Sequence, residues 1–385
     1  MPKKRILFTS GMFPPALGGP GTVLIALIPK LMAEGYSCKV LTFGKSDGKD
    51  YGFPVIRVPH IIQPFKFLFV FWRVLRYAFK ADLIYALDTY SYGICSLIVS
   101  KVLFKPLIVR FTGDSAWEIL FNEGKIDDYL TDFQKTWHGF YPALLKWRRT
   151  IILAGADRII TDCGFLKEFV GLIGVSKEKV TVINNPAGQL PSLENFDSAE
   201  FKNKFSIKGL VILSMSRLVP WKGIGTLINL MPSVIRKFPG TTLLVAGDGP
   251  QEENLKKLVR DLSLEKSVIF LGVVGDKKEK KKFYMISDIV VQNTFYEGMS
   301  NTLVEAMSEG KAIITTDAGG NVEFVDEGNG VIVGYDNAEQ IEKGIMDLLA
   351  DSALRTRLGE ASRIKSKQYS LEKLVEKNIS LINSL

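Results

Sequence analysis

Short β-branched runs alternate with amphipathic helical patterns along nearly the whole chain, and this alternation limits the possible folds more than any other feature. The runs recur at spacings of roughly 20–30 residues, the length of one strand and one crossover helix. A first series lies near residues 5–9, 38–43, 82–86, 107–111, 157–161 and 180–183, and a second near 210–214, 241–246, 268–271, 288–291, 312–315 and 330–333. The pattern predicts an α/β protein with two tandem doubly wound Rossmann-like domains.

A segment with weak periodicity, containing Pro, Gly and Ser, separates the two series near residues 184–201. We therefore expect one domain over residues 1–190 and a second over 191–369. The last segment, 370–385, is an amphipathic helix that we expect to pack back on the first domain. Doubly wound domains bind ligands at the carboxyl ends of their strands, so we expect a shared ligand in a cleft between the two domains.

Composition excludes several classes of protein. The 385 residues are 46% hydrophobic and 23% charged, which is typical of a globular chain. No apolar run is long enough to span a membrane, and the apolar stretch near the N-terminus is too short for a secretory signal. Cys38, Cys95 and Cys163 lack zinc-site spacing, and the chain has two histidines. These features predict a cytoplasmic protein without a metal site.

The positive charge is concentrated in the first half of the chain. Residues 1–190 contain 24 Lys and Arg against 15 Asp and Glu, whereas residues 191–385 contain 25 against 26. This asymmetry indicates an anionic partner such as a membrane surface, a nucleic acid or a phosphorylated substrate, or simply a soluble basic surface.

Two basic segments stand out in the sequence. Residues 65–80 are rich in aromatic residues, and their four cations fall within an arc of about 80° on a helix. This segment is either a helix that docks on an anionic leaflet or a core helix with a solvated basic stripe. The lysine-rich run 277–282 precedes an apolar helix and is interpreted as a solvated helix start.

A glycine-rich turn containing Gly18 and Gly19 follows the first run and precedes an apolar helix. Backbone N–H groups at such a helix start suit a phosphate, although a plain Gly/Pro turn gives the same pattern. In the second half, Arg217 and Lys222 follow a strand and can clamp a diphosphate, unless they are ordinary exposed cations. Gly247, after the next strand, permits a close backbone approach.

The most informative segment contains Glu297 and Glu305, eight positions apart, with a helix expected to begin near Ser300 or Asn301. One acid then lies in the preceding loop and the other within the first turns of the helix. Carboxylates accept hydrogen bonds from vicinal hydroxyls, so the pair can bind a sugar and a ribose. Two solvated glutamates would give the same spacing.

As a set, these residues resemble the retaining glycosyltransferases of family four, which have the GT-B fold. The resemblance covers nearly the whole chain and rests on five sequence features in order: Gly18-Gly19, Ser216-Arg217 with Trp221-Lys222-Gly223, Gly247-Asp248-Gly249, the Glu297 and Glu305 pair, and Asp317-Ala318-Gly319-Gly320-Asn321-Val322-Glu323.

The resemblance implies a role for each matching residue. Arg217 and Lys222 hold the donor diphosphate, Glu297 contacts the transferred sugar, and Glu305 contacts the nucleotide ribose. Gly18 and Gly19 contribute backbone amides near the leaving group.

The same resemblance implies that Gly319 and Gly320 present their backbone amides near the sugar or phosphate. One departure from the family pattern concerns the strand near residues 107–111, after which many relatives carry a histidine that contacts the sugar. Here the chain has a Gly-Asp-x-x-Trp-Glu variant, so we expect Asp114 to bind hydroxyls in its place.

The implied activity is transfer of a sugar from a UDP- or GDP-sugar to an acceptor hydroxyl with retention of configuration. The donor is a co-substrate, and no further cofactor or metal is implied. Expected partners are a sugar or lipid-linked acceptor in cell-surface polysaccharide or glycolipid synthesis and the inner face of an anionic membrane. No nucleic-acid reader motif is present. A GT-B sugar-nucleotide epimerase and a non-catalytic sugar-nucleotide-binding protein are the alternatives.

Overall fold

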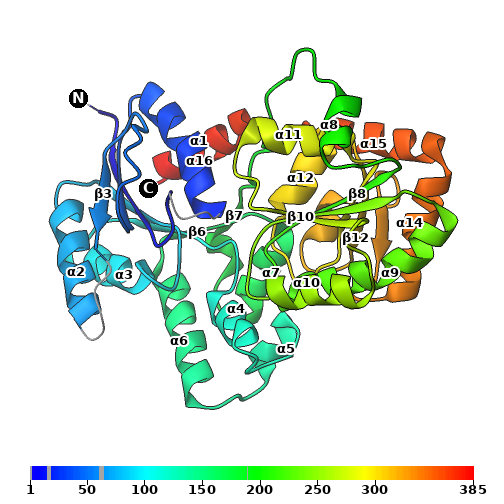
Figure 1. Cartoon of the computed structure of the whole chain (residues 1–385). Helices are drawn as coiled ribbons and strands as arrows, with labels where there is room; N and C mark the ends of the chain where they lie inside the picture. The colour runs from blue at the N-terminus through cyan, green and yellow to red at the C-terminus, as the bar shows by residue number, and fades with distance from the viewer. Residues whose placement is uncertain (1, 15–18, 60–64, 189) are drawn as a thin grey trace. The chain divides into compact units, whose positions relative to one another are not determined.

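The computed structural model describes residues 2–14, 19–59, 65–188 and 190–385 and divides the chain into two compact units (Figure 1). Unit 1 comprises Met1–Pro186 and Leu371–Leu385, and unit 2 comprises Ala187–Ser370. Each unit contains one parallel sheet covered by helices, which confirms the predicted α/β class with two doubly wound domains. Within the described residues, no helix is both long enough and apolar enough to cross a membrane.

Unit 1 is built on a seven-stranded parallel sheet of order β3-β2-β1-β4-β5-β6-β7. Its strands are β1 (Arg5–Ser10), β2 (Ser37–Phe43), β3 (Val55–Val58), β4 (Leu83–Ala86), β5 (Leu107–Arg110), β6 (Arg158–Thr161) and β7 (Val180–Val182). Its helices are α1 (Gly19–Ala33), α2 (Phe65–Ala78), α3 (Gly93–Val102), α4 (Ser115–Asn122), α5 (Leu130–Lys135), α6 (Phe140–Gly155), α7 (Gly164–Leu172) and α16 (Leu371–Asn383).

Right-handed crossovers place the helices of unit 1 on two faces of the sheet. The connections from β1 to β2 and from β2 to β3 run one way along the sheet, the first of them through α1. The connections from β3 onward run the other way and include α2, α3 and α6. The helices α2, α3 and α6 contact one another in that order. The central strands are buried on both faces, which explains their continuous apolar sequences.

The last helix, α16, returns to unit 1 and packs against α1 (Figure 1). Leu374, Leu381 and Ile382 enter the core of this unit. The buried Asn378 side chain accepts a hydrogen bond of 3.0 Å from the hydroxyl of Tyr85 on β4. The helix therefore completes the hydrophobic core on one face of the first sheet.

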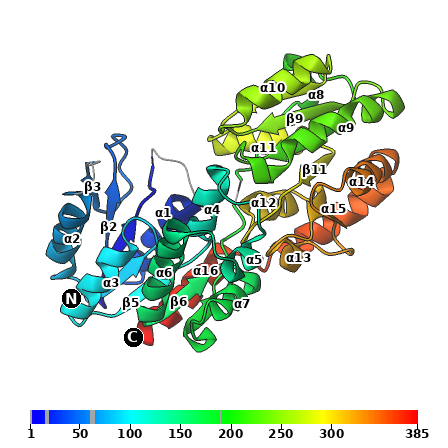
Figure 2. The same ribbon diagram turned by 90° about the horizontal axis from the view of Figure 1, so that it is seen from below.

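Unit 2 contains a six-stranded parallel sheet of order β10-β9-β8-β11-β12-β13. Its strands are β8 (Val211–Met215), β9 (Thr242–Ala246), β10 (Val268–Gly272), β11 (Ile289–Gln292), β12 (Ala312–Thr316) and β13 (Val331–Val333). Its helices are α8 (Ser198–Lys204), α9 (Ile224–Lys237), α10 (Glu252–Asp261), α11 (Lys277–Ile286), α12 (Asn301–Ser308), α13 (Asn321–Phe324), α14 (Ala338–Ala350) and α15 (Ser352–Ser366), with a short 3-10 helix, η2 (Pro220–Lys222). Figure 2 shows α9 and α10 beside each other in this unit.

The strand β3 was not predicted from the sequence. It has four residues, lies at the edge of the first sheet, and pairs with β2 alone. Only Val58 is fully buried, and Arg57 interrupts the apolar run. Such a short, half-exposed strand carries little of the periodicity by which the other strands were found.

The basic stripe predicted on residues 65–80 lies on α2 and its C-terminal end. Val70, Val74 and Ala78 of this helix are buried, as in a core helix. Two of the four predicted cations pack over aromatic rings of the same unit: the Lys66 ammonium lies 4.8 Å from the Phe43 ring centroid, and the Arg73 guanidinium lies over Phe69. The four charges therefore do not all project outward as one stripe, while contact of α2 with a membrane stays a prediction.

Candidate active site

The predicted donor-binding residues of unit 2 follow the carboxyl ends of its parallel strands. The order of strands along the chain reverses between β8 and β11, which lie side by side. Crevices at such switch points are the usual ligand sites of doubly wound sheets. The loop after β8 leads to Lys222, and the loop after β11 leads to Glu297.

The structure brings Lys222 and Glu297 into direct contact. The Lys222 ammonium donates to the Glu297 carboxylate and, at 3.2 Å, to the hydroxyl of Thr294. Lys222 is only 7% exposed, whereas the Glu297 side chain is partly exposed. A buried ammonium needs such a partner because an unpaired charge is costly to remove from water. The pair forms a compensated ionic centre at the switch point.

The turn that carries Lys222 is fixed by its neighbours. Gly223 has a φ of +50°, and a Cβ at this position would lie 2.1 Å from the Asn293 amide nitrogen. That nitrogen donates to the Gly223 carbonyl at 3.0 Å and to the Asp336 carboxylate at 2.8 Å. Glycine is therefore required here both for the backbone conformation and for the close approach of Asn293.

Glu305, the second predicted glutamate, lies inside α12 and contacts two residues of α11. Its two carboxylate oxygens lie 3.0 and 3.2 Å from the Lys280 ammonium. The hydroxyl of Tyr284 donates to the same carboxylate at 3.1 Å. Burial, and then the charge of Glu305, raise the pKa of Tyr284 well above its usual value, so this phenol remains a donor. The carboxylate is thus held in one orientation at the edge of the core.

The contacts of Lys280 correct the interpretation of the run 277–282 as a merely solvated helix start. Lys281, the next residue, pairs with Glu309 at the end of α12. Lys280 and Lys281 therefore tie α11 to the helix that carries Glu305. The signal available in the sequence was the spacing of Lys280 four residues before Tyr284, which places both on one face of α11.

The start of α12 is positioned by side-chain caps. The Ser300 hydroxyl accepts from the backbone N–H of Leu303 and donates to the Gln292 side chain at 2.7 Å. The Thr302 hydroxyl donates to the carbonyl of Met215, the last residue of β8, at 3.0 Å. The predicted helix start near Ser300 or Asn301 is confirmed, because α12 begins at Asn301 with Ser300 as its cap, and its N-terminus is anchored beside the end of β8.

Two of the predicted glycines permit close packing between loops. A Cβ on Gly319, whose φ is +59°, would lie 2.0 Å from the Glu297 carbonyl oxygen. The Gly320 N–H donates to that carbonyl at 3.0 Å. This differs from the predicted role of Gly320, because its amide is occupied within the loop rather than presented to a ligand. The two residues fix the backbone that carries the Glu297 side chain.

Gly247, directly after β9, lies against the loop after β8 that carries Arg217. A Cβ on Gly247 would lie 1.9 Å from the carbonyl oxygen of Ser216, so only glycine allows the loops after β8 and β9 to approach. The Arg217 side chain is exposed, and its guanidinium lies 5.6 Å from the ring centroid of the buried Trp221. This cation–π contact keeps a forked cation at the strand end without burying its charge.

The remaining predicted residues belong to unit 1. Gly18 lies outside the described residues, and Gly19 is the first residue of α1. Asp114 is fully buried, caps α4 through the Ala116 N–H and pairs with Arg149. A hydroxyl contact would require this pair to open, so in this structure Asp114 positions α4 rather than presenting a free carboxylate. The phosphate-binding role of the glycine loop stays a prediction.

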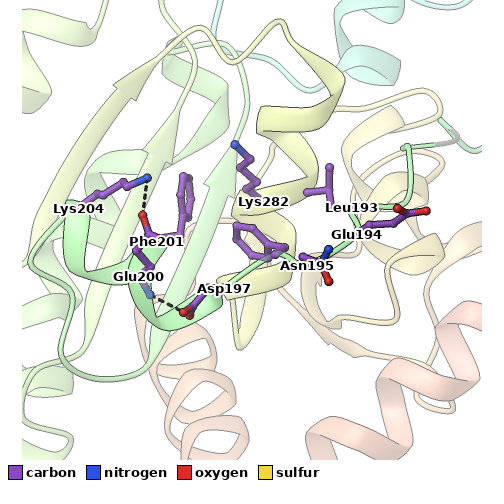
Figure 3. Close-up of a pocket in the computed structure, with 9 residues that line it drawn as sticks. Leu193, Glu194, Asn195, Asp197, Glu200, Phe201, Lys204 and Lys282 are labelled. Carbon is purple, nitrogen blue, oxygen red and sulfur yellow. Dashed lines mark hydrogen bonds and ion pairs between the residues drawn. The ribbon is translucent and has the colours of Figure 1, made fainter.

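A cavity of about 260 Å³ opens elsewhere on unit 2, between the segment before α8, α8 itself and α11 (Figure 3). The ammonium of Lys282 lies over the ring of Phe201, and Lys204 pairs with Glu200 at one side of the cavity. None of the predicted donor residues is among its described lining residues. The cavity is therefore separate from the Lys222–Glu297 centre.

Comparison with known proteins follows the division into two units. Residues 17–187 match the family model for Glycosyltransferase Family 4, and residues 195–365 match the model for Glycosyl transferases group 1. The lipopolysaccharide core biosynthesis glycosyltransferase LpsE of Rhizobium meliloti (strain 1021) is 29% identical over 248 residues, covering 64% of this chain and 68% of that protein. For the next two relatives the match covers 52% and 59% of their length.

A more extensive match is to the alpha-monoglucosyldiacylglycerol synthase of Streptococcus pneumoniae, 23% identical over 326 residues that cover 80% of this chain and 70% of that protein. Among solved structures, Anabaena HepE in complex with UDP and glucose superposes with a TM-score of 0.82 at 21% identity, covering 99% of this chain and all of that one. That likeness shows the fold. With two family models matched in order over the two units, the chain belongs to the family 4, group 1 glycosyltransferases and has the GT-B fold.

Proposed function

We propose that this protein is a retaining glycosyltransferase that moves a sugar from a nucleotide diphosphate sugar to an acceptor hydroxyl. The observation that carries the proposal is the Lys222–Glu297 ion pair at the β8–β11 switch point, with exposed Arg217 on the same loop as Lys222. A cation and a carboxylate at such a point suit a ligand that has phosphate at one end and hydroxyls at the other.

The diphosphate is assigned to Arg217 and Lys222. An ammonium has three N–H donors, and Thr294 and Glu297 account for two of those of Lys222 among the described contacts. The third can reach a phosphate oxygen while the ion pair stays intact. Arg217 offers a planar fork that matches two oxygens at once. Both cations would stabilise the charge that develops on the leaving nucleotide diphosphate, without any proton transfer.

The two glutamates are assigned to hydroxyl groups of the donor. Glu297 lies beside Lys222, so a sugar attached to the bound diphosphate comes within reach of its carboxylate. Glu305 is oriented by Lys280 and Tyr284 and retains a lone pair for a ribose hydroxyl. Because Glu297 is already paired with a cation, we assign it to binding rather than to nucleophilic attack. The family resemblance then implies a front-face mechanism, in which no carboxylate of the enzyme forms a covalent intermediate with the sugar.

The names of the relatives guide the choice of substrates. LpsE acts in lipopolysaccharide core biosynthesis, the pneumococcal relative is a glucosyldiacylglycerol synthase, and HepE was solved with UDP and glucose. We therefore propose a UDP-hexose as the first donor to test, with a GDP-sugar second, and a saccharide or lipid-linked acceptor of cell-surface polysaccharide or glycolipid synthesis. Such acceptors favour action at the cytoplasmic face of the membrane.

A donor panel tests this proposal. UDP-, GDP- and dTDP-sugars are compared by thermal shift, because a ligand that binds the folded state raises its apparent stability. The best donor is then incubated with and without sugar and lipid-linked acceptors, and the anomeric configuration of the product is read by NMR. Transfer with retention supports the proposal. An altered free sugar without acceptor indicates an epimerase, and donor binding without turnover indicates a non-catalytic binding protein.

A further inference from the structure

Helix α6 of unit 1 exposes a continuous row of large apolar side chains. Phe140, Leu144, Trp147 and Ile151 are exposed, with Phe140 89% and Trp147 58% accessible. Their spacing places them within an arc of about 60° on the helix. Trp137, immediately before the helix, is 68% exposed. We call these five residues the α6 stripe.

Helix α6 packs against its own unit through the face opposite the stripe. That face buries Leu145, Arg149 and Ile152. Ile152 approaches Gly93 at the start of α3, where a Cβ would lie 3.2 Å from its methyl group. The helix is therefore seated on its own unit by one face and presents a second apolar face outward. Figure 1 shows α6 as a long helix among α3, α4 and α5. A contiguous exposed apolar row of this kind marks an interaction surface.

The charges that helix α6 itself contributes beside the stripe are all basic, whereas the acidic Asp128 and Asp132 of the preceding segment pair with His138 and Lys135. Helix α6 contains Lys146, Arg148 and Arg149 and no acidic residue. Arg149 is neutralised internally by Asp114. Lys146 and Arg148 lie on opposite sides of the stripe, and both donate to backbone carbonyls, of Phe133 and Thr136 and of Tyr90 respectively, which accept without cancelling their charge.

We infer that the α6 stripe docks unit 1 on an anionic lipid surface. Tryptophan favours the headgroup region, where its apolar ring is buried and its indole N–H stays hydrated, and the phenylalanine and aliphatic side chains of the row add apolar burial. Cations beside the row add electrostatic attraction to anionic lipids. The inference names the docking surface, uses no residue of the donor site, and is separate from the sugar chemistry proposed above.

A second copy of this chain is the other occupant to consider. In a symmetric pair the same patch meets itself, so cations on both sides of the stripe would face like charges across the interface. Anionic headgroups meet the same cations with opposite charge. Charge complementarity therefore favours the lipid surface.

Vesicle sedimentation of the full chain tests the inference. Vesicles containing phosphatidylglycerol are compared with vesicles of phosphatidylcholine alone, at low and high salt and without donor. We expect the unaltered protein to sediment with the anionic vesicles at low salt and less at high salt, because screening weakens the electrostatic part. The triple variant Phe140→Ser, Leu144→Ser, Trp147→Ser should bind them about tenfold more weakly or worse.

A matched variant on α2, Leu68→Ser with Trp72→Ser, removes exposed apolar side chains of the same unit but leaves the α6 stripe intact. It should bind vesicles as the unaltered protein does, whereas the docking of α2 predicted from the sequence would require its binding to fall. Thermal unfolding and UDP binding, measured on both variants, check that the fold is kept. Because the α6 residues are exposed, the triple variant should unfold normally.

Three results would overturn the inference. One is unchanged vesicle binding by the folded triple variant, and another is loss of binding in the α2 variant alone. The third is a dimer in solution, measured by light scattering, that the triple variant dissociates while neither protein binds vesicles. In each case a normal transfer rate to a water-soluble acceptor would leave the proposed activity standing, so the two proposals fail separately.

Discussion

The Lys280 ammonium lies 3.0 and 3.2 Å from the two carboxylate oxygens of Glu305, so one lysine of α11 donates to both oxygens of the glutamate assigned to the ribose. Both side chains are largely buried. The contact orients the carboxylate before any ligand arrives, and this preorganisation reduces the conformational entropy lost on binding.

Replacing Lys280 with Ala removes this cation and leaves a mostly buried carboxylate with Tyr284 as its remaining partner. We expect unfolding of the variant to require about 1–3 kcal/mol less free energy, measured by urea denaturation. The affinity for UDP should fall more than the affinity for 2′,3′-dideoxy-UDP, which lacks the ribose hydroxyls. Lys278→Ala, an exposed position on the same helix, is the control and should change neither quantity. An equal loss of affinity for the two nucleotides would show that Lys280 does not act through the ribose hydroxyls.

The two glutamates should respond differently to neutral substitution. Glu305→Gln should weaken binding of free UDP, because the amide accepts ribose hydroxyls less strongly than a carboxylate. Glu297→Gln should leave free UDP bound almost normally and lower the transfer rate, because its assigned contact is with the sugar. Calorimetry with UDP and a transfer assay distinguish the two. Equal loss of UDP affinity in both variants would show that the assigned roles are misplaced.

Removing either cation of the diphosphate site should weaken donor and free nucleotide diphosphate alike. We expect Arg217→Ala and Lys222→Ala each to cost about 1.5–3 kcal/mol of binding free energy, the scale of a charged hydrogen bond. Lys222→Ala also strips Glu297 of its partner, so Arg217→Ala is the cleaner measurement. Arg236→Ala serves as the control, because Arg236 is exposed in the last turn of α9 and therefore lies at the amino-terminal ends of the strands, away from the site. Unchanged calorimetric affinity in both site variants contradicts the assignment.

Gly319 and Gly272 form a matched pair for separating backbone strain from close packing. Their φ angles are +59° and +64°, but a Cβ on Gly319 would lie 2.0 Å from the Glu297 carbonyl oxygen, whereas a Cβ on Gly272 would meet nothing within 4 Å. Gly272→Ala should cost about 1–2 kcal/mol of stability. Gly319→Ala should cost more and should also lower the transfer rate, because the Glu297 backbone must move. Urea denaturation and kinetics of both variants test this, and similar effects at the two sites would refute it.

Lys311 gives unit 2 a pH-dependent stability. Burial lowers its pKa to about 8, while its ammonium donates to the Ser287 carbonyl at 2.9 Å. The unfolded chain holds this proton up to about pH 10.4, so between these two values the unfolded state binds more protons than the folded state. The free energy of unfolding should therefore rise with pH across this window, by up to about 3 kcal/mol. Subtracting the profile of Lys311→Met isolates the contribution, and identical slopes would disprove it.

The sequence was most informative where a residue's role depends on its position along the chain. Alternating apolar runs predicted the strands of both sheets except β3. The resemblance to family-four glycosyltransferases assigned Lys222 and Glu297 to the same donor, and the structure brings these two residues into contact. The cap at Ser300 was also predictable, since capping is a local interaction.

Roles that depend on tertiary partners were not predictable. The lysine run of α11 looks solvated until α12 is placed beside it, and Asp114 looks like a ligand until Arg149 reaches it from α6. The α6 stripe was missed for a related reason. An apolar row at helical spacing normally faces the core, and only the packing of Leu145 and Ile152 on the inner face shows that this row points outward.

Because α16 completes the core of unit 1 but follows unit 2 in the chain, the two units cannot finish folding in the order in which they begin to emerge from the ribosome. The first sheet leaves the exit tunnel with one face covered only in part, by α1, because Leu374, Leu381 and Ile382 will pack there later. All of unit 2 is synthesised before that helix appears. A nascent chain stalled before residue 371 should therefore hold a complete second unit beside an incomplete first one, and it is during this interval that the first unit depends most on chaperones.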